Sequence, residues 1–349
     1  MRSFERWRRV LGGATSKRAT TVFTIVLIPL LALAVLAAPL AAEAQRADKV
    51  YRVGYLEGSS GSAGAPFLAA FRQAMYELGY VEGRNLVLDA RSAEGKFDRF
   101  PSLARELVRL NPDLLFVATT VGTRAAKAAT TTIPIVFVRV GDPVGSGLVS
   151  DLARPAGNIT GITTISAELT AKRLELLKEM VPTASRIAAL VNPDAPIGRV
   201  QIRNAEAAAR ILGLQLHPVL AVRDSGDLQG AFEAAVRSGA SAVLRMVDFT
   251  RSDLRVETAK LAVKHRLPAM YPYREDVEAG GMMAYGPNVP SQYRQAATLV
   301  HKILRGAKPA DLPIEQPTKF ELMINAKTVK ALGLTIPPSL LMRADQIIE

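Results

Sequence analysis

A repeat with a spacing of 134 residues is the feature of this 349-residue chain that most constrains its fold. Three landmarks recur at that spacing: the start of an apolar run, a glycine behind an amphipathic run, and a proline within a later apolar run. The three pairs are Arg52 and Arg186, Gly79 and Gly213, and Pro134 and Pro268. A constant spacing across all three indicates two copies of one structural unit.

Each copy alternates short apolar runs with amphipathic runs of helical period. The first copy predicts strands at 52–56, 85–90, 114–118 and 133–138, and helices at 67–78, 101–110 and 123–129. The second predicts strands at 186–191, 215–221, 242–247 and 267–271, and helices at 200–212, 228–238 and 254–266. A tail adds strands at 282–285 and 320–324 and helices at 292–304 and 326–332. Such alternation is typical of parallel sheets with right-handed crossovers, so the predicted fold class is α/β, with two doubly wound parallel-sheet lobes.

The amino terminus reads as an export signal. Basic residues such as Arg8 and Arg9 precede an apolar run at 21–36, and Ala42-Glu43-Ala44 has the small-x-small form of a signal-peptidase site. We therefore expect residues 1–44 to be a signal peptide that is cleaved after Ala44, and a periplasmic mature protein. An uncleaved membrane anchor is the alternative, because the apolar run approaches spanning length. Export by the Sec route is favoured over the twin-arginine route, to which Arg8-Arg9 is a weak match.

The composition removes several classes of function. The chain has no cysteine, which excludes disulfides, thiolate metal sites and a lipoprotein anchor. Its three histidines lie far apart in the sequence without ligand spacing, so we expect no metal and no cofactor. The net charge is +12, but Lys and Arg are scattered along amphipathic helices, which favours a solvated surface and no nucleic-acid partner.

The stretch 132–161 begins with the buried-strand run at 133–138, which ends at Gly141-Asp142-Pro143 and leads through a Gly-rich segment to Pro155-Ala156-Gly157-Asn158. This stretch resembles the periplasmic substrate-binding proteins of ABC importers, in the tryptophan/tyrosine-type family. Further matching segments occur at 77–80, 82–85, 284–286, 325–328, 332–334, 336–341 and 343–345. The resemblance covers residues 51 to 345, which is nearly the whole mature chain.

The resemblance implies a type I periplasmic-binding-protein fold whose chain crosses three times between the lobes. Lobe 1 would comprise 48–160 and 282–310, and lobe 2 would comprise 164–280 and 318–349, with hinge crossings near 157–163, 280–284 and 309–318. It also implies a monomer that captures a small organic solute and passes it to ABC permease subunits in the inner membrane. An aromatic amino acid or a related carboxylate is the implied solute. A sensory module and an aromatic carboxylate that is not an amino acid remain alternatives.

The ligand site is expected where the carboxyl ends of strands face the gap between the lobes. Residues behind the first-lobe strands offer hydroxyl groups and helix amino termini that suit a carboxylate. Plain N-capping is the alternative for these hydroxyl residues. The first-lobe candidates are Glu57, Ser59, Ser60, Phe67, Thr119, Thr120, Thr123 and Asp142.

The second-lobe candidates are Asn192, Asp248, Tyr271, Tyr273 and Glu275. Asp248 and Glu275 are acceptors for an ammonium group, and the tyrosines would enclose an aromatic group. The alternatives are that Asp142 and Asp248 only cap turns and that the tyrosines only pack the rim. Amino-acid-binding members of the family tend to carry Gly-Asp where this chain has Pro272-Tyr273, which puts an amino-acid ligand in question.

We expect no enzymatic activity. The glycines at 58–64 do not have the G-x-G-x-x-G spacing of a dinucleotide site, and the sequence holds no G-x-S-x-G elbow or P-loop. Glu57 and Asp142 form a conceivable carboxylate pair, but no histidine or second base is placed to complete a catalytic site.

Overall fold

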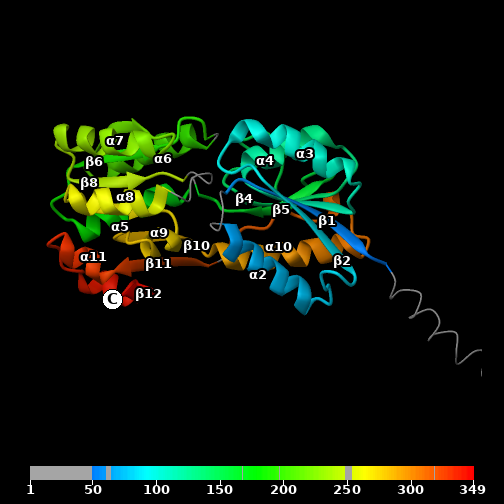
Figure 1. Ribbon diagram of the computed structural model, residues 1–349. Coiled ribbons are helices and arrows are strands. Elements are labelled where there is room, and N and C mark those ends of the chain that lie inside the picture. The colour runs from blue at the N-terminus through cyan, green and yellow to red at the C-terminus, as the bar shows by residue number, and fades with distance from the viewer. Residues whose placement is uncertain (1–48, 60–63, 167, 196, 248–253, 318) are drawn as a thin grey trace, which may run out of the picture. The chain divides into compact units, whose positions relative to one another are not determined.

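The computed structural model describes residues 49–59, 64–166, 168–195, 197–247, 254–317 and 319–349, of which Tyr51–Glu349 form one compact unit (Figure 1). The predicted signal peptide, Ser60 and Asp248 lie outside these residues. Within the described part of the chain, no helix has the length and apolar character that a membrane crossing requires.

The first sheet is parallel, with the order β2-β1-β3-β4-β5. Its strands are β1 (Tyr51–Glu57), β2 (Leu86–Ser92), β3 (Leu114–Ala118), β4 (Ile135–Val140) and β5 (Ile159–Thr163). The helices between them are α2 (Ala65–Glu77), α3 (Phe100–Arg109) and α4 (Thr120–Ala129), with a 3-10 turn η2 (Phe97–Arg99). Every residue of β3, β4 and β5 is buried, as the continuous apolar runs predict for strands that are covered on both faces.

The second sheet has the order β12-β11-β10-β9-β8-β6-β7, in which β10 and β11 are antiparallel and the other neighbours are parallel. Its strands are β6 (Arg186–Val191), β7 (Gln215–Ala221), β8 (Ala242–Arg245), β9 (Ala269–Tyr271), β10 (Met283–Pro287), β11 (Phe320–Asn325) and β12 (Gln346–Ile348). Its helices are α5 (Leu169–Met180), α6 (Gly198–Ile211), α7 (Ser225–Arg237), α8 (Leu254–Lys264), α9 (Arg274–Glu278), α11 (Ala326–Ala331) and α12 (Pro338–Arg343).

The two sheets repeat one strand order, because β1 to β5 correspond to β6 to β10. We call the first sheet with α2, α3, α4 and α10 (Val289–Leu304) the first lobe, and the remainder from α5 onward the second lobe. The helix that follows the last parallel strand of each copy packs on the other copy: α5 follows β5 but packs on α6, and α10 follows β10 but packs on α2 (Figure 1).

The exchange of α5 and α10 corrects one predicted boundary. We predicted that the chain returns to the first lobe at Met282, but β10 pairs with β9 and β11 in the second sheet, and the return begins only with α10. The segment between 309 and 317, which includes the 3-10 turn η3 (Pro309–Asp311), lies against β5: the Thr163 amide donates to the Glu315 carbonyl at 3.0 Å. Three segments therefore connect the two sheets.

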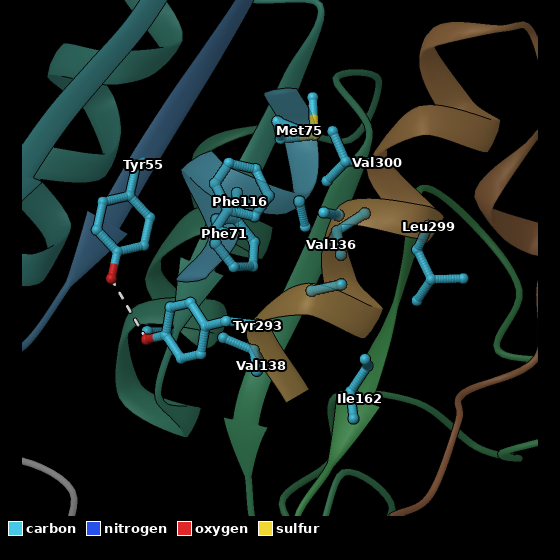
Figure 2. Close-up of a cluster of buried hydrophobic side chains, with 14 of the residues drawn as sticks. Tyr55, Phe71, Met75, Phe116, Val136, Val138, Ile162, Tyr293, Leu299 and Val300 are labelled. Carbon is cyan, nitrogen blue, oxygen red and sulfur yellow. Dashed lines mark hydrogen bonds between the residues drawn. The ribbon is translucent and has the colours of Figure 1, made fainter. Parts of the chain in front are cut away.

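The hydrophobic core of the first lobe holds α2 and α10 against β3 and β4. Phe71 and Met75 of α2 and Leu299 and Val300 of α10 pack on Phe116 and its neighbours in β3 and β4 (Figure 2). The Phe71 and Phe116 rings stack with centroids 4.3 Å apart. Tyr293 of α10 belongs to the same cluster, so the exchanged helix carries a tyrosine to the carboxyl ends of the first-lobe strands.

Candidate functional site

A buried arginine, Arg139, lies at the carboxyl end of β4. Arg139 is 3% exposed, and its backbone adopts a φ of 59°. Its guanidinium carbon lies 5.2 Å from the centroid of the Phe67 ring. A non-glycine residue at such a φ costs on the order of 1–3 kcal/mol, and this kind of strain is concentrated at functional sites. A guanidinium over an aromatic face gains about 0.5–2 kcal/mol, more when water is excluded.

Two tyrosines complete the surroundings of Arg139 in the first lobe. The hydroxyl groups of Tyr55 and Tyr293 lie 3.3 Å apart (Figure 2), and Tyr293 is also hydrogen-bonded to Arg139. The Phe67 and Tyr293 rings stack with centroids 5.6 Å apart. Burial raises the pKa of both tyrosines, so their hydroxyl groups stay protonated: Tyr55 donates to Glu57 and Tyr293 donates to the Tyr55 oxygen.

Glu57, at the end of β1, faces the same cluster. Its Oε2 accepts hydrogen bonds from the Ser59 hydroxyl at 3.1 Å and the Tyr55 hydroxyl at 3.3 Å. Burial raises the pKa of Glu57, while these hydrogen bonds and the charge of Arg139 oppose the rise. A Cβ at Gly64 would lie 2.1 Å from that same oxygen, so only glycine there leaves the carboxylate in place.

The second lobe places Tyr273 and Glu275 opposite Arg139. Tyr273 is 2% exposed and belongs to the first lobe's hydrophobic cluster although it follows β9. Glu275 lies in the first turn of α9, and its Oε2 is buried without a hydrogen-bond partner among the described residues. Burial raises the pKa of Glu275, and Arg255 and Arg139 act against that rise. Charged and aromatic groups of both lobes therefore meet at one place.

A second buried arginine, Arg173 of α5, lies near this cluster. Its Nε donates to the Tyr285 carbonyl at 2.7 Å and its Nη1 to the Ser166 carbonyl at 3.2 Å. Tyr273 is hydrogen-bonded to the Ser166 side chain, and both Arg173 and Arg139 lower the pKa of Tyr273 against the larger raising effect of burial. Arg173 thus lies beside the first crossing segment and close to the Tyr273 hydroxyl.

The predicted threonines at the start of α4 form hydrogen bonds within that helix. Thr119 caps α4 by accepting from the Gly122 amide at 3.2 Å, and Thr123 donates to the Thr119 carbonyl at 2.7 Å. Thr120 and Asp142 line a separate cavity of about 20 Å³ together with Ile197, which is room for about one water molecule. Asp142 accepts from the Gly145 amide at 2.7 Å, so its carboxylate caps a turn, as the alternative interpretation held.

Two predicted second-lobe residues, Asn192 and Tyr271, make their contacts within their own lobe. Asn192 is 4% exposed and accepts from the Asp194 amide at 3.0 Å, within its own loop. Tyr271 is fully buried in the hydrophobic cluster that α7 and α8 share with the second sheet. Of the thirteen predicted residues, the structure groups Glu57, Ser59, Phe67, Tyr273 and Glu275 around Arg139.

Sequence analysis missed Arg139, Arg173 and Tyr293. Arg139 had a usable signal, since it is the one charged residue in the otherwise apolar strand β4. Arg173 had none, because its helix was not predicted and its sequence is rich in charged residues. Tyr293 reaches the site only through the exchange of α10, which strand and helix patterns do not reveal.

Two α/β lobes that bring charged and aromatic side chains together from facing strand ends define a type I periplasmic-binding-protein architecture. The model of the ABC transporter substrate binding protein family matches residues 62–348, and the chain belongs to that family. Members of this family bind solutes and are not enzymes.

Relatives and solved structures agree with this assignment. A tyrosine-binding protein of Clostridioides difficile (strain R20291) is 26% identical over 265 residues, which span 76% of this chain and 75% of the relative. A conserved domain protein from Vibrio cholerae is 28% identical with a TM-score of 0.81, over 86% of this chain and 100% of that one. The ABC domain of Streptococcus pneumonia in complex with L-Trp is 24% identical with a TM-score of 0.80 and the same coverage, and is similar in fold.

Proposed function

We propose that this protein is the extracytoplasmic solute-binding component of an ABC importer. It captures a small organic solute, either an aromatic amino acid or a related carboxylate, by closure of the two lobes and delivers the solute to a membrane permease. The proposal includes export by a cleaved signal peptide into the periplasm, and a monomeric state. The observation that carries it is the position of Arg139, buried against Phe67 in the first lobe and opposite Tyr273 and Glu275 of the second.

The chemistry of the cluster suits this class of solute. A guanidinium offers two parallel N–H groups to a carboxylate, and the hydroxyl groups of Tyr55 and Tyr293 connect the Arg139 side to Glu57 through hydrogen bonds. The rings of Phe67 and Tyr273 provide apolar area for an aromatic group, worth about 0.5–1.5 kcal/mol beyond burial for a well-placed ring pair. Glu57 and Glu275 supply acceptors for an ammonium group.

Closure follows from contacts that only the closed form makes. Shifting a population from 1:99 to 99:1 requires about 5.5 kcal/mol of differential binding free energy. A hydrogen bond to a charged group contributes about 1.5–3 kcal/mol. Two or three contacts from second-lobe residues such as Tyr273 and Glu275 therefore suffice to close the lobes over a solute held by the first lobe.

An aromatic carboxylate without an ammonium group is the second candidate solute. Burial raises the pKa of both Glu57 and Glu275, which favours their neutral forms and weakens them as ammonium acceptors. A zwitterion needs an ionised acceptor at this position, whereas a simple acid needs only the arginine.

The test is a melting and calorimetry panel on the mature chain. It compares L-tyrosine, L-tryptophan and L-phenylalanine with 3-phenylpropanoate and 4-hydroxyphenylacetate. At least one of these solutes should raise the melting temperature and be recovered unchanged, and deletion of the gene should abolish its uptake by cells. If no solute binds, the proposed capture of aromatic solutes is wrong, and if one binds but uptake survives deletion, the transport role is wrong.

A further inference from the structure

Arg173 is an unusual residue because its charge is buried without a carboxylate bound to it. The residue is 1% exposed, and within the described residues neither a salt bridge nor a hydrogen bond joins it to a carboxylate. Its two hydrogen bonds go to backbone carbonyls, and Nη2 has no hydrogen-bond partner in that part of the chain. Burial lowers the pKa of Arg173 to about 10, so the side chain is still charged at neutral pH.

Buried arginines elsewhere in the second lobe are paired. Arg245 and Arg255 both bind the fully buried carboxylate of Asp276, and the Arg255 contact measures 3.3 Å. A buried charge that lacks a counter-ion costs several kcal/mol, and ionisable groups with perturbed pKa values cluster at functional sites. Asp276 also raises the pKa of Arg173, against the larger effect of burial, but the second lobe places no carboxylate in direct contact with Arg173 among the described residues.

A shared hydrogen-bond partner, Ser166, connects Arg173 to Tyr273 of the candidate site. Nη1 shares Ser166 with the Tyr273 side chain, and that tyrosine lies within the electrostatic reach of Arg139 as well. Such effects on a pKa are strongest when the charge lies within about 4–6 Å. One buried guanidinium from each lobe therefore acts on the Tyr273 hydroxyl.

We propose that Arg173 is the second-lobe anchor for the acidic group of the solute. In this arrangement Nη2 donates to an oxygen of the carboxylate, the Tyr273 hydroxyl lies beside it, and Arg139 holds the same carboxylate from the first lobe. The inference rests on the proposed function and deepens it: an organic acid is bound by its anionic group, and an ammonium group is not required. Closure is coupled to the acid because the carboxylate contacts both lobes.

The experiment compares three solutes that share one aromatic ring: 3-phenylpropanoate, L-phenylalanine and 2-phenylethylamine. We expect the two acids to bind and the amine to fail. Arg173→Gln should weaken binding of the acids by about 10- to 100-fold, because one hydrogen bond to a charged group is lost. Arg173→Lys keeps the charge but shortens the reach, and should weaken binding by about 10-fold. Lys172→Gln, an exposed neighbour on the same helix, is the matched control and should bind as the wild type does.

Two readouts separate recognition from folding. The melting temperature of the unliganded Arg173→Gln protein should stay equal to that of the wild type or rise, since a buried unpaired charge is removed. The increase in melting temperature caused by the acid should be lost at the same time. Acid binding that is equal in Arg173→Gln and wild type overturns the inference while leaving the proposed function intact, and so does tight binding of the amine. Failure of the wild type to bind any aromatic solute overturns both.

Discussion

The two lobes share a strand order but surround their buried arginines differently. Arg139 of the first lobe lies on a strained strand end, over the Phe67 ring and within reach of tyrosine hydroxyl groups. Arg173 of the second lobe lies on a regular helix, among backbone carbonyls of the crossing segment and of β10. The first arrangement offers an aromatic, preorganised platform, whereas the second links solute contact to the segments that join the lobes.

The exchange of helices explains this difference. α10 comes from the second copy of the repeat and carries Tyr293 to the first lobe, where it meets Tyr55 and Phe67. α5 comes from the first copy and carries Arg173 to the second lobe. Each lobe therefore takes one site residue from a helix whose preceding strand belongs to the other lobe.

The repeat itself gives the test with the largest expected effect. Gly161 in β5 and Gly286 in β10 occupy corresponding strands, and a Cβ would lie 2.3 Å from the Phe137 carbonyl oxygen at the first and 2.0 Å from that of Pro272 at the second. A backbone carbonyl cannot move away from a new methyl group as easily as the end of a flexible side chain can. Gly161→Ala and Gly286→Ala should therefore each lower the free energy of unfolding by about 3 kcal/mol or more. Chemical denaturation measures this value.

The control for the glycine test is Gly230→Ala in α7, where a Cβ meets nothing within 4 Å. This change should be neutral or stabilise by about 0.5–1 kcal/mol, because alanine loses less entropy in a helix. If only one of the two strand glycines is sensitive, the close approach of backbone is not a shared property of the two copies, and the correspondence of β5 with β10 is weakened.

The comparison of the two arginines gives the second test. Arg139→Gln should weaken binding of an aromatic acid by about 100-fold, since hydrogen bonds to a charged group and the contact with the Phe67 ring are lost together. This effect should exceed that of Arg173→Gln, because the Arg139 substitution removes a contact with an aromatic ring in addition to the hydrogen bonds. Calorimetry at matched temperature measures both, and Arg105→Gln, exposed on α3, serves as the control.

A larger loss in Arg173→Gln than in Arg139→Gln would reverse the assignment. The second lobe would then make the stronger contacts with the solute, and the first lobe would supply the contacts that form on closure.

Much of the fold could be predicted because strand burial leaves a direct record in the sequence. The runs at 114–118 and 186–191 match the buried strands β3 and β6 in full. The run at 215–221 also matches β7, although no residue of β7 is buried. β5 was interpreted as a crossing because its Thr and Gly residues lack the apolar composition of its neighbours. α5 was missed, and Met282 was assigned to the wrong lobe, because the helix exchange depends on tertiary packing and not on local periodicity.

The site was only partly predictable for a different reason. Strand ends identified Glu57, Ser59 and Tyr273 as candidates, since parallel strands align their carboxyl ends. Whether a hydroxyl faces a ligand or bonds to its own helix depends on side-chain rotamers: Thr119 caps α4, and the Thr123 hydroxyl donates to the Thr119 carbonyl. The position of Arg173 relative to the site depends on the segment that crosses between the lobes, which local sequence patterns do not define.

The smallest expected effect distinguishes the carboxylates of the two lobes. Burial raises the pKa of Glu57 and Glu275 above the ordinary value of 4.5, so the native state binds the proton more tightly than the unfolded state does. By linkage, the free energy of unfolding must then rise as the pH falls from above the raised pKa toward 4.5, and it levels off below that value. Glu57 receives two hydroxyl donors, whereas Oε2 of Glu275 has no partner in the described residues.

Glu275→Gln should therefore stabilise the unliganded protein at pH 7, by a margin that shrinks toward pH 4.5. Glu57→Gln should stabilise it less or not at all, because the substitution also disturbs the hydrogen bonds from Ser59 and Tyr55. Thermal unfolding of the wild type and both variants across this pH range measures the difference, with Glu278→Gln, exposed on the same short helix, as the control. Equal pH profiles for Glu57→Gln and Glu275→Gln would contradict this prediction. They would mean that the hydroxyl donors at Glu57 do not lower the energetic cost of its burial, and that the environments of the two carboxylates are equivalent although those of the two arginines differ.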